Sequence, residues 1–341
     1  MALRDKQNPG SELKLKDLID IVAWQKVQDN FSTVTEVGIR TVDNQGKAFT
    51  KPSRLPRLCQ LLIDSPQKDK ICGACLPTFL GGKGVVDKNL SFNCDDLTGL
   101  HNFVAPLSIN GQNLGYVVLG PVILVMRKTK EEYHKVAEEL GVNLEDFWSA
   151  MLEIKVMSFQ GMQSLVELIR DLGQYAIALA YSNVLKNEGI LNLGYSPLKL
   201  NKLFEILLDV AFEISGADIG SIMFFDKTSD SFTIRVSRGI PADIAAKTRV
   251  KMGDGISGTV AKEGEPILVD SETRDNRIKQ YLARPYISSS MVLPLKSEND
   301  VLGVMNLAAL QTSTVKFNKS NLSLMNRLAG LASIAIQKDP S

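Results

Sequence analysis

Cysteine and histidine are scarce in this sequence of 341 residues, which holds four cysteines and two histidines. No cysteine lies beyond Cys94 and no histidine lies beyond His134. The second half of the chain therefore lacks thiol nucleophiles and imidazole ligands, and general acid–base catalysis would depend on carboxylates, among which no pair stands out. We find no Walker loop, no kinase or receiver signature and no helix-turn-helix, so we expect the protein not to be an enzyme.

An excess of one charge and long apolar runs are also absent. Lys and Arg total 39 against 38 for Asp and Glu, a net charge of +1, so the chain lacks the basic excess of nucleic-acid-binding or membrane-surface proteins. The apolar stretch 116–126 is shorter than the ~20 residues of a membrane-spanning helix, and residues 1–18 contain no signal-peptide core. We expect a cytoplasmic protein with no direct nucleic-acid binding and no membrane association.

What is present is ordinary globular composition. Hydrophobic residues make up 44% and charged residues 23% of the chain, a composition that supports folded domains with hydrophobic cores. The length favours two domains. The patterns predict an α+β fold in which each domain is an antiparallel sheet with flanking helices, with a long helix joining the two. We place the first domain at 13–185, a linker rich in turn-forming residues at 186–197, and the second domain at 198–338.

The predicted elements of the first domain are, in order, a helix at 14–30, a strand at 37–42, a returning strand at 47–50, a helix at 57–63, strands at 102–109 and 114–125, and helices at 131–140, 144–152 and 162–185. The strands at 102–109 and 114–125 flank a turn at Asn110-Gly111 and predict a hairpin in the centre of the sheet.

The predicted elements of the second domain are a helix at 198–214, strands at 220–226 and 232–237, a helix at 256–261, strands at 292–296 and 302–310, and a helix at 321–337. Both domains thus share one order, in which a strand pair, an intervening region and a second strand pair lie between helices.

Two predicted helices carry an apolar stripe. The stripe residues are Leu165, Leu168, Ile169, Leu172, Tyr175, Ala176 and Leu179 in the first helix, and Leu322, Met325, Leu328 and Leu331 in the second. Such a stripe packs either on its own domain or on a second copy of the chain. We predict a homodimer.

Residues 196–338 resemble a GAF domain. The motifs that carry the resemblance are 216–218, 221–226, 237–241, 253–261, 266–270, 289–295, 302–307 and Phe317. The resemblance implies a PAS/GAF-like fold, used either to bind a ligand or to dimerise and relay a signal. The absence of Cys and His excludes a thioether-linked bilin, the catalytic thiols of GAF-type methionine sulfoxide reductases and the usual haem ligand. Leu307 and Asn321-Leu322 replace charged residues of the cyclic-nucleotide signature, of which Asn306 and Phe317 remain.

Residues ~13 to ~185 resemble the PocR sensory domain. The motifs that carry this resemblance are 18–20, 58–62, Ser65-Pro66, Cys72, Gly99-Leu100, 103–107, Gly111 and 114–121. The family resembles PAS-type sensors, and the resemblance implies binding of small hydrocarbon derivatives such as diols. The sequence departs from the family pattern at Asp96-Leu97, where Cys-His is frequent, and at Pro121, where Gln is frequent. The predicted ligand-binding residues are Trp24, Cys59, Asp96, His101, Phe103 and Leu107, an apolar wall beside polar groups.

The four cysteines, Cys59, Cys72, Cys75 and Cys94, are confined to one short segment. Cys72 and Cys75 flank Gly73-Ala74, a spacing that can aim two thiolates at one ion, so zinc or an iron–sulfur cluster would suit the set. The alternative is that Cys59 is a small core residue.

The sequence as a whole predicts a signal-transduction sensor. We expect the first domain to bind a small organic ligand and the GAF-like domain to relay the change to a separate partner such as a kinase or a transcription regulator. The alternative is a metal- or redox-sensing protein, or a redox enzyme, built on the four cysteines.

Overall fold

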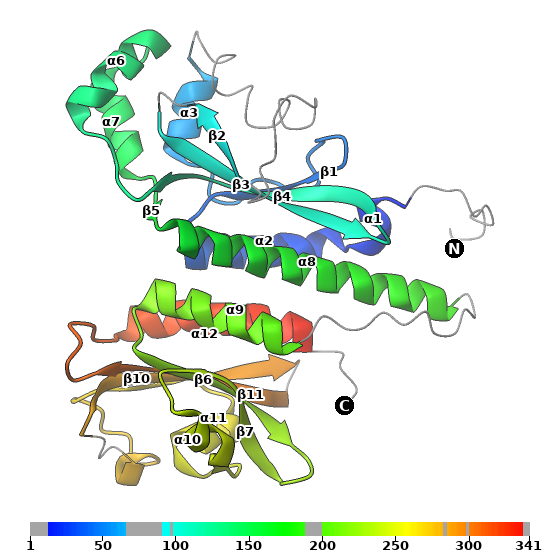
Figure 1. The fold of residues 1–341 in the computed structure, drawn as a ribbon, viewed down its shortest axis with the longest axis vertical. Coiled ribbons are helices and arrows are strands. Elements are labelled where there is room, and N and C mark those ends of the chain that lie inside the picture. The colour runs from blue at the N-terminus through cyan, green and yellow to red at the C-terminus, as the bar shows by residue number, and fades with distance from the viewer. Residues whose placement is uncertain are drawn as a thin grey trace. The chain divides into compact units, whose positions relative to one another are not determined.

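The computed structural model describes residues 13–65, 91–95, 98–187, 200–281, 285–297 and 300–336. The chain forms two compact units, one around each of two sheets, and each unit is described by itself (Figure 1). Of the helices in these ranges, none is long and apolar enough to cross a membrane.

The first sheet contains the predicted hairpin at its centre. The strand order is β1-β4-β3-β2, with β5 paired in parallel to β4 and the other pairs antiparallel. The strand bounds are β1 (Ile39–Asp43), β2 (Ser91–Asp95), β3 (Leu100–Ile109), β4 (Gln112–Leu124) and β5 (Val156–Met157). The predicted α+β class and the central position of the hairpin are confirmed.

Two helices, α2 (Ile21–Thr35) and α8 (Phe159–Asn187), contribute their segments 21–29 and 173–187 to the same compact unit as this sheet, and these segments lie on one of its faces (Figure 1). Gly173 of α8 lies so close to the sheet that an added Cβ would sit 2.5 Å from Leu107 Cδ2 and 3.2 Å from Trp24 Cη2. A helix can approach a sheet this closely only where it lacks a side chain. Trp24 and Leu107 therefore belong to a closed apolar layer between the sheet and these helices.

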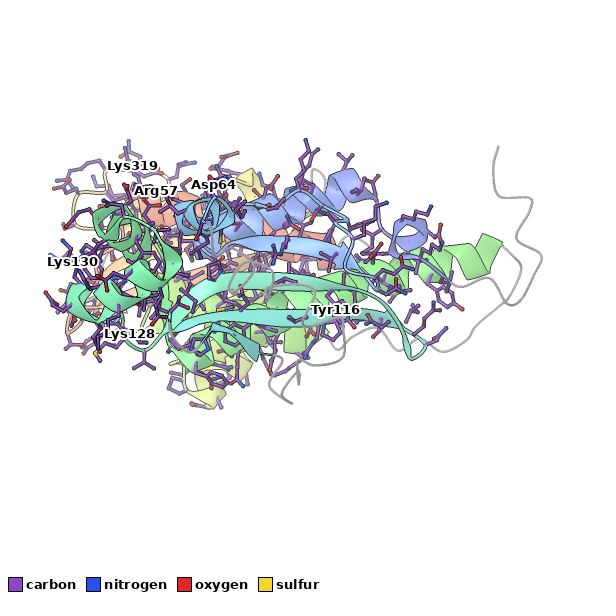
Figure 2. The ribbon with its side chains drawn as sticks, turned by 90° about the horizontal axis from the view of Figure 1, so that it is seen from above. Arg57, Asp64, Tyr116, Lys128, Lys130 and Lys319 are labelled. Atoms are coloured by element: carbon purple, nitrogen blue, oxygen red, sulfur yellow. The ribbon has the colours of Figure 1, made fainter. Side chains whose placement is uncertain are left out.

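Three further helices, α3 (Arg57–Ile63), α6 (Lys130–Leu140) and α7 (Leu144–Leu152), lie together at one end of the sheet (Figure 1). They enclose an apolar cluster of their own, which includes Tyr133 and Phe147 with ring centroids 5.8 Å apart. The Thr129 side chain caps the start of α6. Arg57, at the start of α3 (Figure 2), reaches Asp146 of α7 at 3.1 Å.

Two predictions for the first domain were wrong in detail. The helix predicted at 14–30 is broken into α1 (Leu15–Leu18) and α2, because Asp20 accepts hydrogen bonds from the backbone N–H groups of Val22 and Ala23 and so caps a new helix. The predicted strand at 47–50 is not a strand, and its Ala48 makes an isolated bridge to Val42 of β1. Thr50 bonds to Thr41 twice, because its backbone N–H donates to the Thr41 carbonyl oxygen at 3.2 Å and its hydroxyl oxygen accepts from the Thr41 N–H at 2.9 Å.

The second sheet is six-stranded and antiparallel, in the order β8-β7-β6-β11-β10-β9. The strand bounds are β6 (Ile219–Asp226), β7 (Ser231–Arg238), β8 (Arg249–Val250), β9 (Ile267–Val269), β10 (Ile287–Ser297) and β11 (Asp300–Leu310). Helices α9 (Leu200–Ser215) and α12 (Lys319–Ile336) cover one face, and α10 (Ala242–Lys247) and α11 (Gly255–Glu263) lie on the other (Figure 1). A short 3-10 helix, η2, spans Lys279–Tyr281.

Close packing fills both faces of this sheet. On the α9 side, the rings of Phe204 and Phe224 lie 4.5 Å apart. On the α11 side, a cluster that includes Phe232, Val260 and Val304 is buried. The predicted elements of this domain are thus present, whereas the helix that was expected to join the domains stays a prediction, since residues 188–199 lie outside the described ranges.

Candidate functional site

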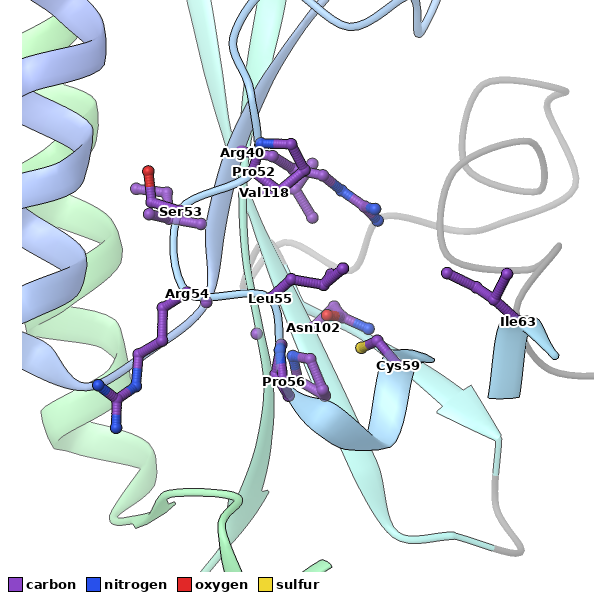
Figure 3. A pocket seen from close by; sticks show the side chains of 14 residues that line it. Arg40, Pro52, Ser53, Arg54, Leu55, Pro56, Cys59, Ile63, Asn102 and Val118 are labelled. Atoms are coloured by element: carbon purple, nitrogen blue, oxygen red, sulfur yellow. The ribbon is translucent and has the colours of Figure 1, made fainter. Parts of the chain in front are cut away.

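A pocket of about 110 Å³ opens on the face of the first sheet that α2 and α8 do not cover (Figure 3). Its described lining comes from β1, β3, β4, the loop before α3, and α3 itself. The lining residues are Gly38, Ile39, Arg40, Pro52, Ser53, Arg54, Leu55, Pro56, Cys59, Ile63, Asn102, Val118, Gly120 and Pro121. Pockets for drug-sized ligands have volumes of roughly 300–1,000 Å³. The smaller volume of this pocket therefore suits a ligand of only a few heavy atoms.

The floor of the pocket depends on two glycines. The Gly120 N–H donates to the Gly38 carbonyl oxygen at 2.8 Å. A Cβ on Gly38 would lie 2.7 Å from the Gly120 carbonyl oxygen, and one on Gly120 would lie 2.6 Å from Asn102 Oδ1. Gly120 also has a φ of 123°, which side-chain-bearing residues avoid. Any other residue at either position would force the backbone beside the pocket to shift.

The loop 52–56 forms the wall of the pocket. Its Ser53 pairs with Ile39 of β1 through two backbone hydrogen bonds, at 2.9 and 3.1 Å. Arg54 has a φ of 52°, in the left-handed region that non-glycine residues seldom occupy. Pro56 then starts α3, which presents Cys59 and Ile63 to the pocket. A strained residue beside a pocket marks a loop that is held in place by its surroundings.

A buried polar network holds this wall from behind. Gln28 of α2 is fully buried, and its Oε1 accepts from the hydroxyls of Thr41 at 3.0 Å and Thr50 at 2.6 Å. Its Nε2 donates to the Lys51 carbonyl oxygen and to Ser53 Oγ, both at 2.8 Å. One side chain thus ties α2 to β1 and to the start of the loop that lines the pocket.

The described lining of the pocket combines apolar and positively charged residues. Leu55, Ile63 and Val118 supply apolar surface, and the Asn102 side chain supplies a buried amide. The charged residues in the described lining are Arg40 and Arg54, and no carboxylate is among them.

The structure separates the predicted ligand-binding residues. Trp24, Phe103 and Leu107 are at most 3% exposed. Leu107 and Trp24 pack against Gly173 on the helix-covered face, and Phe103 lies on that face too, because it alternates with Val104 of the opposite face along β3. His101 is half-buried on β3. Asp96 lies outside the described residues.

Among the described residues of the predicted ligand-binding set, Cys59 alone lines the pocket, where it is half-buried on α3. Of the other three predicted metal ligands, Cys72 and Cys75 lie outside the described residues, and Cys94 is described only as a backbone position in β2. Within the described part of the chain, no three His, Cys, Asp or Glu side chains are grouped to hold a metal ion. The zinc or iron–sulfur site at Cys59, Cys72, Cys75 and Cys94 stays a prediction.

Sequence reasoning missed most of the pocket lining, including Arg40, Asn102 and Gly120. The structure shows why Asn102 was missed: it lies at a bulge in the β3–β4 pairing, where the register shifts between His101 and Phe103, and a bulge is not visible in the sequence. Bulges redirect a side chain and occur beside functional sites.

The second unit carries a smaller polar group on the α11 face of its sheet. The Ser257 hydroxyl, in the first turn of α11, donates to Asn306 Oδ1 at 2.7 Å, and Asn306 Nδ2 donates to Ser221 Oγ at 3.2 Å. Leu307, in the place of the charged signature residue, is 1% exposed. The side chain of Asn306 is thus engaged inside the domain itself.

Two family models match the chain. The model described as "Sensory domain found in PocR" matches residues 17–181, and the model described as "GAF domain" matches residues 198–337. The two matches and the two α+β folds define a signal-sensing protein. The chain carries a PocR sensory domain followed by a GAF domain.

No curated protein matches the chain. Among solved structures, the GAF domain of a phosphoenolpyruvate-protein phosphotransferase from Acinetobacter is 16% identical, with 53% of this chain and 94% of that chain covered and a TM-score of 0.37. The second GAF domain of DevS from Mycobacterium smegmatis is 22% identical, with 41% and 94% covered and a TM-score of 0.33.

Proposed function

We propose that the protein is a non-enzymatic sensor whose PocR domain binds a small organic ligand in the pocket beside Gly38 and Gly120. The GAF domain passes the resulting change to a separate signalling partner. The observation that supports this proposal is the pocket itself, which combines apolar surface with a few polar groups on a rigid sheet. A ligand that prefers one conformation of the loop 52–56 would shift the population toward it.

A homodimer is a second element of the proposal, although the single chain already buries much of the predicted apolar stripes. Leu165 and Leu168 of α8 are fully buried, and so are Met325 and Leu328 of α12. This burial favours the alternative in which each stripe packs within its own chain. The interface of a homodimer would therefore be formed by other surface residues. Light scattering at micromolar protein concentration measures whether the particle has the mass of one chain or of two.

The ligand proposal is tested by filling the pocket. Ile63 is 46% exposed, so the fold tolerates a larger side chain there, and Ile63→Trp should occupy the space that a ligand needs. The control is Val22→Trp on α2, because Val22 is 63% exposed and lies outside the pocket lining.

The measurement is the rise in melting temperature of the full chain with propane-1,2-diol, 1-propanol or propionate at matched ionic strength. We expect at least one compound to stabilise the wild type and the Val22→Trp variant but not the Ile63→Trp variant. Equal stabilisation of both variants would place the ligand elsewhere, and no stabilisation by any of the three compounds would contradict the proposal.

A further inference from the structure

We infer that α2 is the output helix of the sensory domain, the element that moves when the wall of the pocket moves. The loop 52–56 forms this wall, and its first residues are hydrogen-bonded to side chains of α2. The inference rests on the proposed ligand pocket and adds the element through which a change at the pocket leaves it.

One face of α2 is bonded to the chain just before the loop. Gln25, Gln28 and Asp29 are three and four residues apart, so they share one face of the helix. The Gln25 side chain accepts from the Lys51 N–H at 2.9 Å and donates to the Lys51 carbonyl oxygen at 3.2 Å. The Lys51 carbonyl oxygen also accepts from Gln28. The backbone of Lys51 is therefore held by α2 through both of its polar groups.

Ser53 is the residue at which these contacts converge. Its Oγ accepts from the side-chain amide of Gln28 at 2.8 Å and from that of Gln25 at 3.3 Å. The same hydroxyl donates to Asp29 Oδ1. Ser53 is 7% exposed, and hydrogen bonds are stronger in such buried surroundings than in water. The position of Ser53 is thus fixed relative to α2.

The loop connects this fixed point to the pocket through a stiff segment, Pro52-Ser53-Arg54-Leu55-Pro56. A proline at each end fixes φ, and the residue before each proline is restricted to extended conformations. Figure 3 shows that the side chains of Ser53 and Leu55 leave the loop on opposite sides, with Leu55 on the side of Cys59. Between them, Arg54 holds a φ of 52°. A displacement of Leu55 is therefore passed to Ser53 rather than absorbed.

The far end of α2 lies beyond the part that holds the loop. The helix is uninterrupted from Ile21 to Thr35, and residues 21–29 belong to the first compact unit, whereas residues 30–36 belong to the second. In this far part, Phe31 and Val34 are at most 1% exposed. Closely packed side chains transmit strain, so a shift of α2 also changes the surroundings of its far end.

The first experiment measures amide exchange by mass spectrometry on the full chain without ligand. Ser53→Ala removes the hydroxyl that bonds to α2 and keeps the backbone pairing with Ile39. We expect exchange in residues 21–35 to become at least about tenfold faster, the scale of one or two lost hydrogen bonds. Exchange in β4 should change by less than about twofold, because only a local opening is made easier.

The matched control is Ser149→Ala on α7. Its exposed hydroxyl accepts from Arg57 Nη1 at 3.1 Å, so the control also removes one hydroxyl acceptor from the sensory domain. We expect it to leave exchange in residues 21–35 unchanged.

The second experiment perturbs the pocket side of the loop. Ile63→Trp fills space in the pocket, which Ile63 lines together with Leu55, and should change exchange in residues 21–35 by at least about twofold, the lower end of coupling between neighbouring sites. In an Arg54→Gly background this effect should be lost, because glycine makes the joint between Ser53 and Leu55 flexible.

Three outcomes overturn the inference. They are unchanged exchange in residues 21–35 of Ser53→Ala, an equal rise there and in β4, and an Ile63→Trp effect that is absent or that survives Arg54→Gly. The second experiment decides the question if Ser53→Ala does not fold. Neither experiment contains a ligand, so the ligand tests of the proposed function succeed or fail independently of these results.

Discussion

Replacing Gln28 with leucine tests the buried network that holds the wall of the pocket. Leucine is close to glutamine in volume, so the change removes hydrogen bonds and keeps the packing. Gln28 makes four such bonds, with the Thr41 hydroxyl, the Thr50 hydroxyl, the Lys51 carbonyl oxygen and Ser53 Oγ. After the change, the Lys51 oxygen still accepts from Gln25 at 3.2 Å. The hydroxyl protons of Thr41 and Thr50 lose the acceptor that they share.

The expected cost follows from the two stranded hydroxyls. A buried polar group without a partner costs about 1–3 kcal/mol, and partial reorientation of the hydroxyls reduces the sum, so we expect a loss of about 2–4 kcal/mol. For a domain of about 150–250 residues, each kcal/mol lowers Tm by about 2–4 °C. The melting transition of the PocR domain should therefore fall by about 4–16 °C in scanning calorimetry of the full chain.

The matched control is Gln60→Leu on α3. Gln60 is exposed, and its Nε2 donates a hydrogen bond to Asp64 Oδ2 at 3.3 Å. Substitutions at such exposed sites usually stay within about 0.5 kcal/mol. If Gln28→Leu and Gln60→Leu lower Tm equally, or if neither lowers it, the network does not stabilise the wall as we argue.

Three further predictions concern the remaining parts of the fold. Tyr133→Phe should lower the free energy of unfolding in urea by about 0.5–1.5 kcal/mol. The change keeps the ring and removes one buried hydrogen bond, which the hydroxyl donates to the Thr98 carbonyl oxygen at 3.3 Å. An unchanged urea midpoint would show that this hydrogen bond does not stabilise the domain. Gly258→Ala should destabilise the GAF domain, because the added Cβ would collide with the Lys251 carbonyl oxygen. Gly330→Ala should stabilise α12 by up to about 1 kcal/mol, because its Cβ meets nothing within 4 Å. A higher urea midpoint for Gly258→Ala than for Gly330→Ala would refute this prediction. The side-chain hydrogen bond from Arg277 holds the pKa of Asp275 below its ordinary value, so any stabilisation by this carboxylate is present above the ordinary pKa and is lost as pH falls through the lowered pKa. Arg277→Gln should therefore raise the pKa of Asp275 in an NMR titration. An unchanged pKa would show that Arg277 does not cause the lowering.

The spacing of apolar residues predicted most helices and strands well, because the residues that an element buries recur with the period of that helix or strand. The helix predicted at 57–63 is α3, and the helix predicted at 144–152 is α7. The errors arose where polar side chains form specific hydrogen bonds. Asp20 breaks the first helix by capping a new one, and the Thr50 hydroxyl bonds to the backbone of Thr41 and to Gln28 beside an irregular pairing with β1. Such contacts do not follow the spacing of apolar residues, so the hydrophobic pattern of the sequence does not reveal them.

The candidate site was predicted less well because both faces of the first sheet carry buried apolar residues. Alternation along β3 places Phe103 and Val104 on opposite faces, but both are at most 1% exposed. The sequence therefore could not show which face the helices cover. The prediction placed the pocket at the aromatic residue Phe103, which lies on the face that the helices cover. The pocket lies on the other face, beside Val118. The close approach of Gly38 to Gly120 depends on residues far apart in the chain, so no local pattern indicated it.

Hydrogen exchange measured with and without bound ligand tests the central claim most directly. The ligand is whichever of propionate, 1-propanol and propane-1,2-diol raises Tm most, and the readout is amide exchange by mass spectrometry across the full chain. We predict that the ligand slows exchange in the peptides covering 38–40 and 52–63, which form the floor and wall of the pocket. Slowing confined to the GAF domain, or to the helix-covered side around Gly173, would contradict the assignment of the sensory site.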